Sequence, residues 1–132
     1  MPRHNSYDYA VVRVVPRVER EEFVNVGVIV SCPAKDFLEA RIELSEQRLL
    51  SIDPGVNLTA VRSHLASIPL ICAGGAAAGP IGLLSQRERF HWLVAPRSTM
   101  IQVSAVHTGR CADLAATLEH LLNVMVRPAA AD

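Results

Sequence analysis

The stretch "EEFVNVGVIVSCP", from Glu21 to Pro33, decides the fold. Every second residue from Val24 to Cys32 is a valine or the cysteine, and this alternation predicts a buried strand with one fully apolar side. The other side carries Asn25 and Gly27 where the strand begins. A polar residue and a glycine at this place indicate either a special local backbone geometry, such as a bulge, or a functional site.

The segment before it, "YDYAVVRVV" from Tyr7 to Val15, is rich in aromatic and β-branched residues on both sides. This pattern is typical of a central strand that is covered on both faces. Pro16 ends the strand, and the connection to Val24 is shorter than a parallel crossover requires. We therefore expect the two strands to form an antiparallel hairpin.

The rest of the chain predicts an α+β fold. After the hairpin we expect a strand over 37–44, a helical turn over 45–53 and a helix that Asn57 caps and Pro69 kinks or ends. A small-residue loop over 72–82 and a short helix near 83–88 should follow. We expect two further strands over 89–95 and 101–106, and a last helix after Asp113. This order favours a mostly antiparallel sheet of about five strands with two main helices packed on one face. We expect a single domain over 1–132, with frayed or disordered ends near 1–5 and 127–132.

Composition excludes several classes of function. The formal net charge is zero, which argues against nonspecific binding of nucleic acid or membranes. No apolar run approaches the 18 residues of a membrane span, and the first residues, "MPRHNSYDY", lack the apolar region of a signal peptide. The three cysteines are far apart and have no metal-ligand spacing. We expect a cytoplasmic protein with free thiols and with no metal or cofactor.

Arg13 stands in the middle of the most apolar strand, where a guanidinium is costly unless it is paired. In the expected hairpin Arg13 comes close to Asn25, and Glu22 lies just before. Two interpretations remain open: a charge-assisted brace that holds the connection 16–22, or a small polar recognition site. Gly27 fits both interpretations, because a missing side chain permits a bulge or a close approach of another backbone.

Motifs of catalysis are absent from the sequence. There is no nucleophile elbow, no HExxH and no paired-carboxylate signature, and "GGAAAG" lacks the ending of a phosphate-binding loop. Arg97 and His107 are further candidates for a site around a phosphate or carboxylate. Trp92 is either a core residue or an interface anchor.

Three stretches together resemble the DUF3037 family, an uncharacterised bacterial family. They are "YDYAVVRVVPRVEREEFVNVGVIV", "AGPIGLL" and "LVAPRSTMIQVSAVHTG". The most specific element is R-x-x-P followed by E-x-x-N-x-G, which holds Arg13, Pro16, Glu22, Asn25 and Gly27 in this sequence. The resemblance implies a stand-alone bacterial protein without an established activity. It also implies genes beside those of HipA-like kinase-fold proteins, which suggests a partner or a regulatory role.

Two functional hypotheses follow. The first is a protein-interaction or regulatory module that binds a protein partner, either itself or a larger bacterial protein such as a HipA-like kinase fold, in a homo- or hetero-oligomer. The second is an enzyme or nucleotide-binding accessory that uses the Arg13, Glu22 and Asn25 cluster, with Gly27, Arg97 and His107 as further site residues. We favour the first, because the catalytic signatures are missing.

Overall fold

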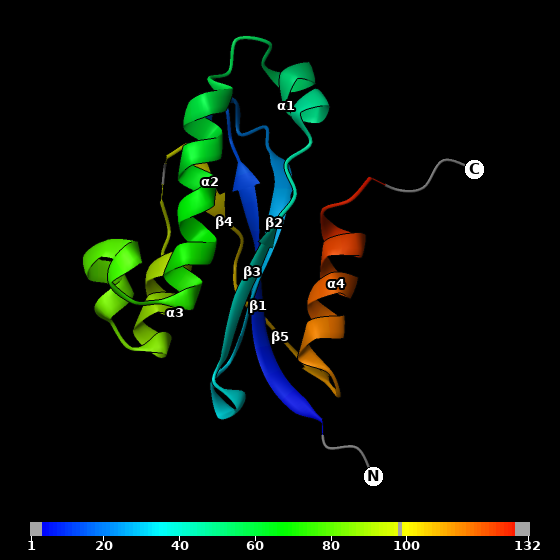
Figure 1. Cartoon of the computed structure of the whole chain (residues 1–132). Helices are drawn as coiled ribbons and strands as arrows, with labels where there is room; N and C mark the ends of the chain where they lie inside the picture. The colour runs from blue at the N-terminus through cyan, green and yellow to red at the C-terminus, as the bar shows by residue number, and fades with distance from the viewer. Residues whose placement is uncertain (1–3, 98, 129–132) are drawn as a thin grey trace.

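The computed structural model describes residues 4–97 and 99–128, and in it an antiparallel sheet of five strands lies between helices (Figure 1). The strands are β1 (Asn5–Val14), β2 (Val24–Cys32), β3 (Phe37–Ile42), β4 (Ile101–Val103) and β5 (His107–Cys111). The α-helices are α1 (Glu46–Ile52), α2 (Leu58–Ala73), α3 (Gln86–Val94) and α4 (Leu114–Met125), and the 3-10 helices are η1 (Val18–Arg20), η2 (Pro33–Lys35) and η3 (Ala76–Leu83). The strand order is β3-β2-β1-β4, and β5 also pairs with β1. The α+β class and the antiparallel sheet are confirmed.

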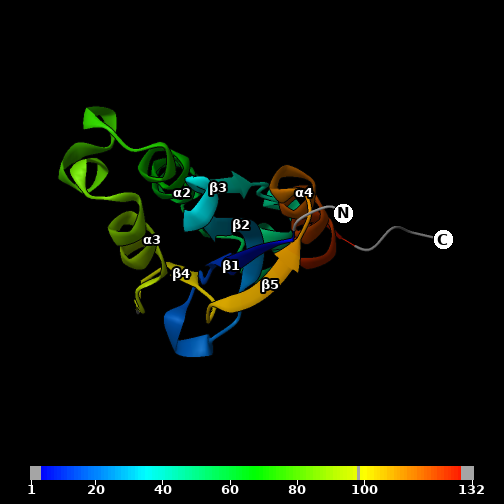
Figure 2. The ribbon, with the colours of Figure 1, turned by 90° about the horizontal axis from the view of Figure 1, so that it is seen from below.

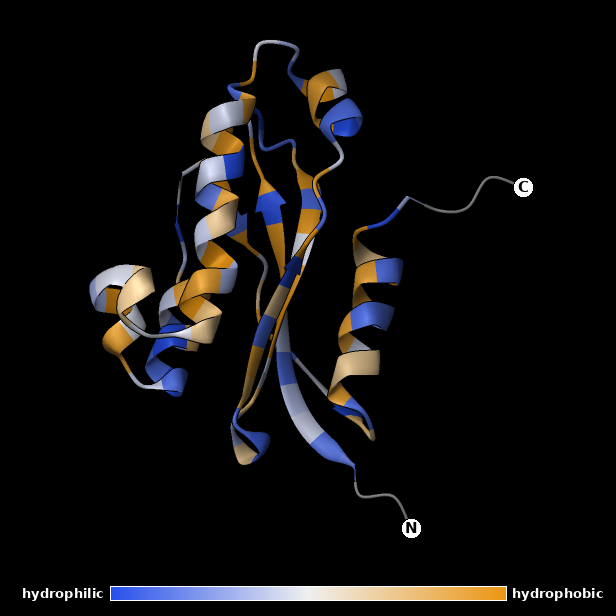
Figure 3. Ribbon diagram, viewed as in Figure 1, coloured by the Kyte–Doolittle hydropathy of each residue, from blue (hydrophilic) through white to orange (hydrophobic). Residues whose placement is uncertain are grey.

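The two main helices do not share a face of the sheet. Helix α2 packs with Ile29 of β2 in one apolar cluster, whereas α4 packs with Val28 and Val30 in a second cluster. Because neighbouring residues of a strand point to opposite faces, the two helices cover opposite sides (Figures 1 and 2). The expectation of two helices on one face is therefore wrong, and both faces of β2 are apolar because each has its own helix. Figure 3 shows apolar residues, in orange, along the central strands and along both α2 and α4.

A β-bulge interrupts the pairing of β1 with β2. Val12 lies opposite Gly27 and Arg13 lies opposite Asn25, so Val26 is the extra residue. The bulge shifts the alternation by one residue: Val24 and Val26 belong to the α2 cluster, whereas the later valines belong to the α4 cluster. The single apolar side expected from the sequence is thus divided between two cores.

Gly27 is required at this bulge for packing. A Cβ atom there would lie 2.5 Å from Ile42 Cδ1 and 2.7 Å from the carbonyl oxygen of Arg41. Both contacts come from β3, which runs beside β2 at this point. Of the two explanations for the polar start of the strand, local backbone geometry accounts for the glycine.

One local prediction is wrong, and one half of another is excluded. Residues 89–94 belong to helix α3 instead of a strand, and Ala95 is its C-cap, because Ser85 and Glu88 make a reciprocal capping box that starts a helix. Pro69 does not end α2, which continues to Ala73. Ile68 and Ile71, on either side of the proline, are both buried against the sheet, and this packing offsets the lost hydrogen bond.

The expectation of frayed or disordered ends near 1–5 and 127–132 falls largely on residues that the structure does not describe. Residues 1–3 and 129–132 lie outside the described residues, but Asn5 already pairs in β1 and Arg127 forms ion pairs. Within 4–97 and 99–128, no single helix is long and apolar enough to cross a membrane. Helices α2 and η3 meet that length and composition together, but with a bend of 66° between them.

Candidate functional site

Strand β4 forms an edge of the sheet, next to β1. Val15 N–H donates to Met100 O at 2.7 Å, and Ser104 N–H donates to Val11 O at 2.8 Å. Hydrogen-bonded pairs alternate along an antiparallel ladder, so the N–H and C=O groups of Ile101 and Val103 face away from β1. No strand pairs with that side in the part of the chain that the structure describes.

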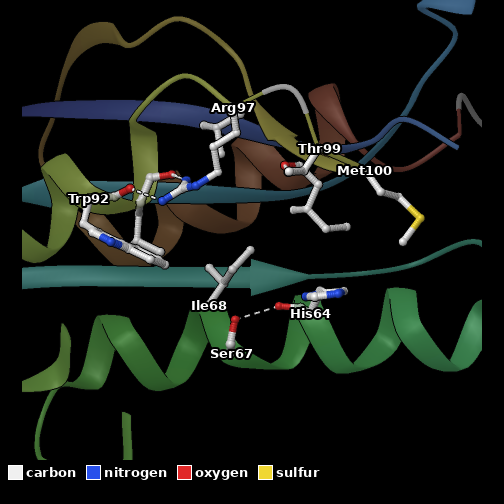
Figure 4. Close-up of a pocket in the computed structure, with 10 residues that line it drawn as sticks. His64, Ser67, Ile68, Trp92, Arg97, Thr99 and Met100 are labelled. Carbon is white, nitrogen blue, oxygen red and sulfur yellow. Dashed lines mark hydrogen bonds between the residues drawn. The ribbon is translucent and has the colours of Figure 1, made fainter. Parts of the chain in front are cut away.

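An apolar groove of about 280 Å³ lies beside this edge, between α2, the end of α3 and β4 (Figure 4). Its apolar wall consists of Ile68, Leu93, Met100, Ile101 and Val103. Two polar side chains, His64 and Ser67, also line the groove and come from α2, as Ile68 does. Trp92 borders the groove and keeps 40% of its surface exposed. The interpretation of Trp92 as a core residue is therefore wrong.

Arg97 fixes the position of Trp92. Its guanidinium donates to Trp92 O at 2.6 Å, to Leu93 O at 3.1 Å and to Ala95 O at 3.5 Å, at the C-terminus of α3 where carbonyl groups lack helical partners. Its Cζ also lies 4.3 Å from the centroid of the Trp92 ring, a cation–π contact (Figure 4). The tryptophan is therefore held in place on the surface before anything binds.

A second hollow, of about 400 Å³, adjoins the groove at Arg97. Its lining residues are Arg13, Val15, Val18, Glu21, Phe23, Arg97 and Gln102. Arg13 lies opposite Gln102 in the sheet, and its Cζ stacks 4.3 Å from the Phe23 ring centroid. The Nε of Arg13 is buried and has no hydrogen-bond partner among the described residues. Two half-buried guanidinium groups thus border one open space.

The hydrogen-bonded brace expected around Arg13 is not formed. The Glu22 carboxylate pairs with Arg20. Asn25 donates from Nδ2 to Met125 O at 3.0 Å and so holds the end of α4, while its Oδ1 is buried without a partner in the described part of the chain. The short polar start of β2 therefore anchors a helix and does not neutralise Arg13.

The remaining predicted site residues lie elsewhere. Gly27 serves the bulge, as described above. His107 stacks on Tyr9, with 5.4 Å between ring centroids, and Tyr9 is four residues from Arg13 along β1, roughly 13 Å at the usual rise. Of the six candidates the structure brings Arg13 and Arg97 to one place and leaves Glu22, Asn25, Gly27 and His107 outside it.

A charged cluster of four residues, Arg41, Glu43, Glu119 and Arg127, lies at β3, the strand on the other edge of the sheet. Arg127 donates to Glu43 at 2.6 Å and to Glu119 at 2.5 Å, and Arg41 also pairs with Glu119. The hydrogen bonds from Arg127 lower the pKa of the Glu43 carboxyl and that of the Glu119 carboxyl below their ordinary value. The same bonds raise the pKa of Arg127. This cluster ties the chain after α4 to the end of β3.

The groove and the hollow offer groups that can bind a ligand. Within the described residues, no three His, Cys, Asp or Glu side chains are placed to hold a metal ion. The groove provides apolar surface, and the hollow provides guanidinium donors. The edge of β4 adds main-chain groups that face away from β1, although Ile101 O already accepts a hydrogen bond from Thr99 Oγ1 at 3.1 Å. This combination can bind an extended peptide or an anionic group.

Sequence reasoning missed several residues of this site. Phe23 and Gln102 were not singled out, and Trp92 was placed on a strand. The capping box from Ser85 to Glu88 is a recognisable helix start, and it would have placed Trp92 and Arg97 at the end of a helix. No comparable local signal marks Gln102, because its role depends on the pairing of β4 with β1.

Comparison with protein families finds one match. The family model described as "Protein of unknown function (DUF3037)" matches residues 9–126, a range that includes the groove and the hollow. No curated protein and no solved structure matches the chain.

Proposed function

The chain belongs to the DUF3037 family, and we propose that it is a protein-interaction module that docks an extended segment of a partner protein along the outer edge of β4. One observation carries the proposal: the outward main-chain groups of Ile101 and Val103 lie beside an apolar groove. A peptide that joins a sheet edge gains main-chain hydrogen bonds, and pockets beside the edge select its side chains.

Trp92 is the anchor residue of this surface in the proposal. Tryptophan is enriched among the residues that dominate binding energy, especially where neighbouring groups exclude water. Arg97 already immobilises the ring through its stacking contact, so little side-chain entropy remains to be lost on binding. The groove beneath the ring provides space for an apolar side chain of the partner.

The partner that we propose is a larger bacterial protein of the HipA-like kinase fold, as the family resemblance suggests, with the chain as its regulatory subunit in a cytoplasmic hetero-oligomer. A homo-oligomer through the same edge is the second possible assembly. The alternative role, an enzyme or nucleotide-binding accessory built on Arg13, Glu22 and Asn25, has less support, because Glu22 and Asn25 bond to other groups.

The proposal is tested by co-purification of the chain with the HipA-like kinase-fold protein. We expect a stable complex with the wild-type chain and a loss of affinity of roughly 30-fold for Trp92→Ala, since truncation of an anchor residue costs about 2 kcal/mol. Val124→Ala is the matched control, because Val124 is 54% exposed on α4, on the other face of the sheet. We expect this control to bind as well as the wild type.

Two outcomes would contradict the proposal. Equal affinity of Trp92→Ala and wild type, with unchanged melting temperatures, would place docking outside the groove. The absence of any complex with the kinase-fold protein would reject that partner, and sedimentation of the chain alone would then show whether a second copy occupies the edge.

A further inference from the structure

The two sides of β4 present different chemistry. Ile101 and Val103 line the apolar groove on the α2 side, whereas Gln102 lines the hollow with Arg13 and Arg97 on the other side. Residues directly opposite each other on neighbouring strands point to the same face of the sheet. A segment that joins β4 therefore directs one side chain toward the groove, the next toward the hollow and the next toward the groove again.

The hollow has an excess of positive charge, because two guanidinium groups and a single carboxylate, that of Glu21, line it. In residues 4–97 and 99–128, five other arginines contact a carboxylate: Arg17, Arg20, Arg41, Arg62 and Arg127. Arg13 and Arg97 have no such contact within the same range, although Glu21 also lines the hollow. In a chain whose formal net charge is zero, this place has two cations without a paired anion.

Both guanidinium groups are held in position. The Cζ of Arg13 lies 4.3 Å from the centroid of the Phe23 ring, and its Nε is buried without a partner in the described chain. Arg97 has three hydrogen bonds to carbonyl groups, and two of its five N–H donors are left for a ligand. A guanidinium fork binds a carboxylate through two parallel hydrogen bonds, and such charge-assisted bonds are stronger than neutral ones.

We propose that the docked segment has an alternating sequence, apolar then acidic then apolar, with the carboxylate of its central Asp or Glu in the hollow between Arg13 and Arg97. This inference rests on the proposed docking along β4 and names the chemistry of the partner. The apolar side chains enter the groove next to Trp92, and the carboxylate offsets the excess positive charge. Charge complementarity then fixes the register of the segment, because a shift by one residue turns the carboxylate to the apolar side.

Selection from random peptides displayed on phage tests this inference without knowledge of the partner. Against the wild-type protein we expect enrichment of peptides that alternate apolar and acidic residues. Against Arg13→Gln we expect apolar residues at the same spacing without the acidic preference, and against Trp92→Ala a loss of the apolar preference. Melting curves establish that each variant is folded.

The outcomes separate the inference from the proposed function. Enrichment of apolar peptides with no acidic preference would overturn the inference and leave docking intact. No enrichment of any peptide would overturn both. Enrichment of peptides equal to a segment of this chain would identify a second copy as the occupant.

A synthetic peptide from the selection provides the decisive measurement. Exchange of its central Glu for Gln should weaken binding to the wild type by at least about tenfold, and should weaken binding to Arg13→Gln less, because only Arg97 remains there to pair with the carboxylate. Each protein is compared with itself on two peptides, so a difference in stability between the two proteins cancels. Equal losses for both proteins would show that the carboxylate binds elsewhere. Inorganic phosphate that displaces the peptide only from the wild type would confirm an oxyanion site in the hollow, and a lack of displacement at high phosphate would contradict it.

Discussion

The β3 edge and the β4 edge of the sheet differ in how their charges are used. At β3, Arg41 and Arg127 pair with Glu43 and Glu119, so these four charges offset one another. At β4, the guanidinium groups of Arg13 and Arg97 have no carboxylate among the described residues, and outward main-chain groups lie beside an apolar groove. Proteins protect exposed edges with charged side chains to avoid unwanted pairing. The β4 edge lacks this protection, as expected of an edge that receives a partner.

The largest effect is expected where β3 joins the sheet. Gly27→Val places a side chain against the backbone of β3, at the Arg41 carbonyl and at Ile42. We expect a loss of about 3 kcal/mol in the free energy of unfolding, because a backbone carbonyl has to move. Urea denaturation measures this loss. Gly55→Ala is the control, because a Cβ there would only meet Asp53 Oδ1 at 3.7 Å. A change below about 1 kcal/mol for Gly27→Val would show that the β3 edge adapts freely.

A smaller, pH-dependent effect is expected from Arg127→Met. Arg127 lowers the folded-state pKa of Glu43 and that of Glu119. The stabilisation of the folded state by these ion pairs is therefore fully present at a pH above the ordinary carboxyl pKa of 4.5. It is lost as the pH falls through the lowered pKa values of the two carboxyls in the folded state. We expect wild type and Arg127→Met to differ in melting temperature at neutral pH and to converge in acid. The side chains are partly exposed, so high salt should also reduce the difference.

Arg62→Met serves as the control for that experiment. Arg62 of α2 pairs with Glu46 of α1 and takes no part in the cluster of Arg127, and its side chain is more exposed than that of Arg127. We expect it to change the melting temperature less than Arg127→Met does, because Arg127 contacts two carboxylates and Arg62 contacts one. A difference for Arg127→Met that stays constant from neutral to acid pH would contradict the proposed cause.

The smallest effect concerns single amide protons at the β4 edge and involves no change in stability. The amide of Gln102 faces β1, and we expect it to exchange slowly with solvent. The amides of Ile101 and Val103 face outward, and we expect them to exchange quickly in the free protein and slowly once a partner segment has docked. Hydrogen exchange followed by NMR measures each amide. Slow exchange of all three in the free protein would mean that the edge is already occupied.

Much of the sheet could be predicted from the sequence. Val24 and Cys32 bound β2 as predicted, and the short connection after Pro16 correctly indicated an antiparallel hairpin. These successes depend on local alternation and on chain length, both of which are visible in a single segment. A bulge near Gly27 was one of the interpretations that the sequence left open, because an unbroken alternation of valines hides a shift that only the pairing with β1 reveals.

The candidate site could be predicted only in part. Arg13 was recognised because a cation in an apolar strand is costly, and Arg97 was named as a second candidate. The prediction of Glu22 and Asn25 as partners of Arg13 was wrong, because nearness in a hairpin does not decide which of several groups a side chain bonds. The segment 89–95 was misassigned because the apolar residues of a short segment fit a strand or a helix equally well.

The bulge in β2 also has a consequence for how the protein unfolds. One strand supplies Val24, Val26 and Ile29 to the core under α2, and Val28, Val30 and Cys32 to the core under α4. If either core opened alone, β2 would lose the packing on one face and weaken the other core with it. The two cores are thus coupled through a single strand, and both should melt in one cooperative transition.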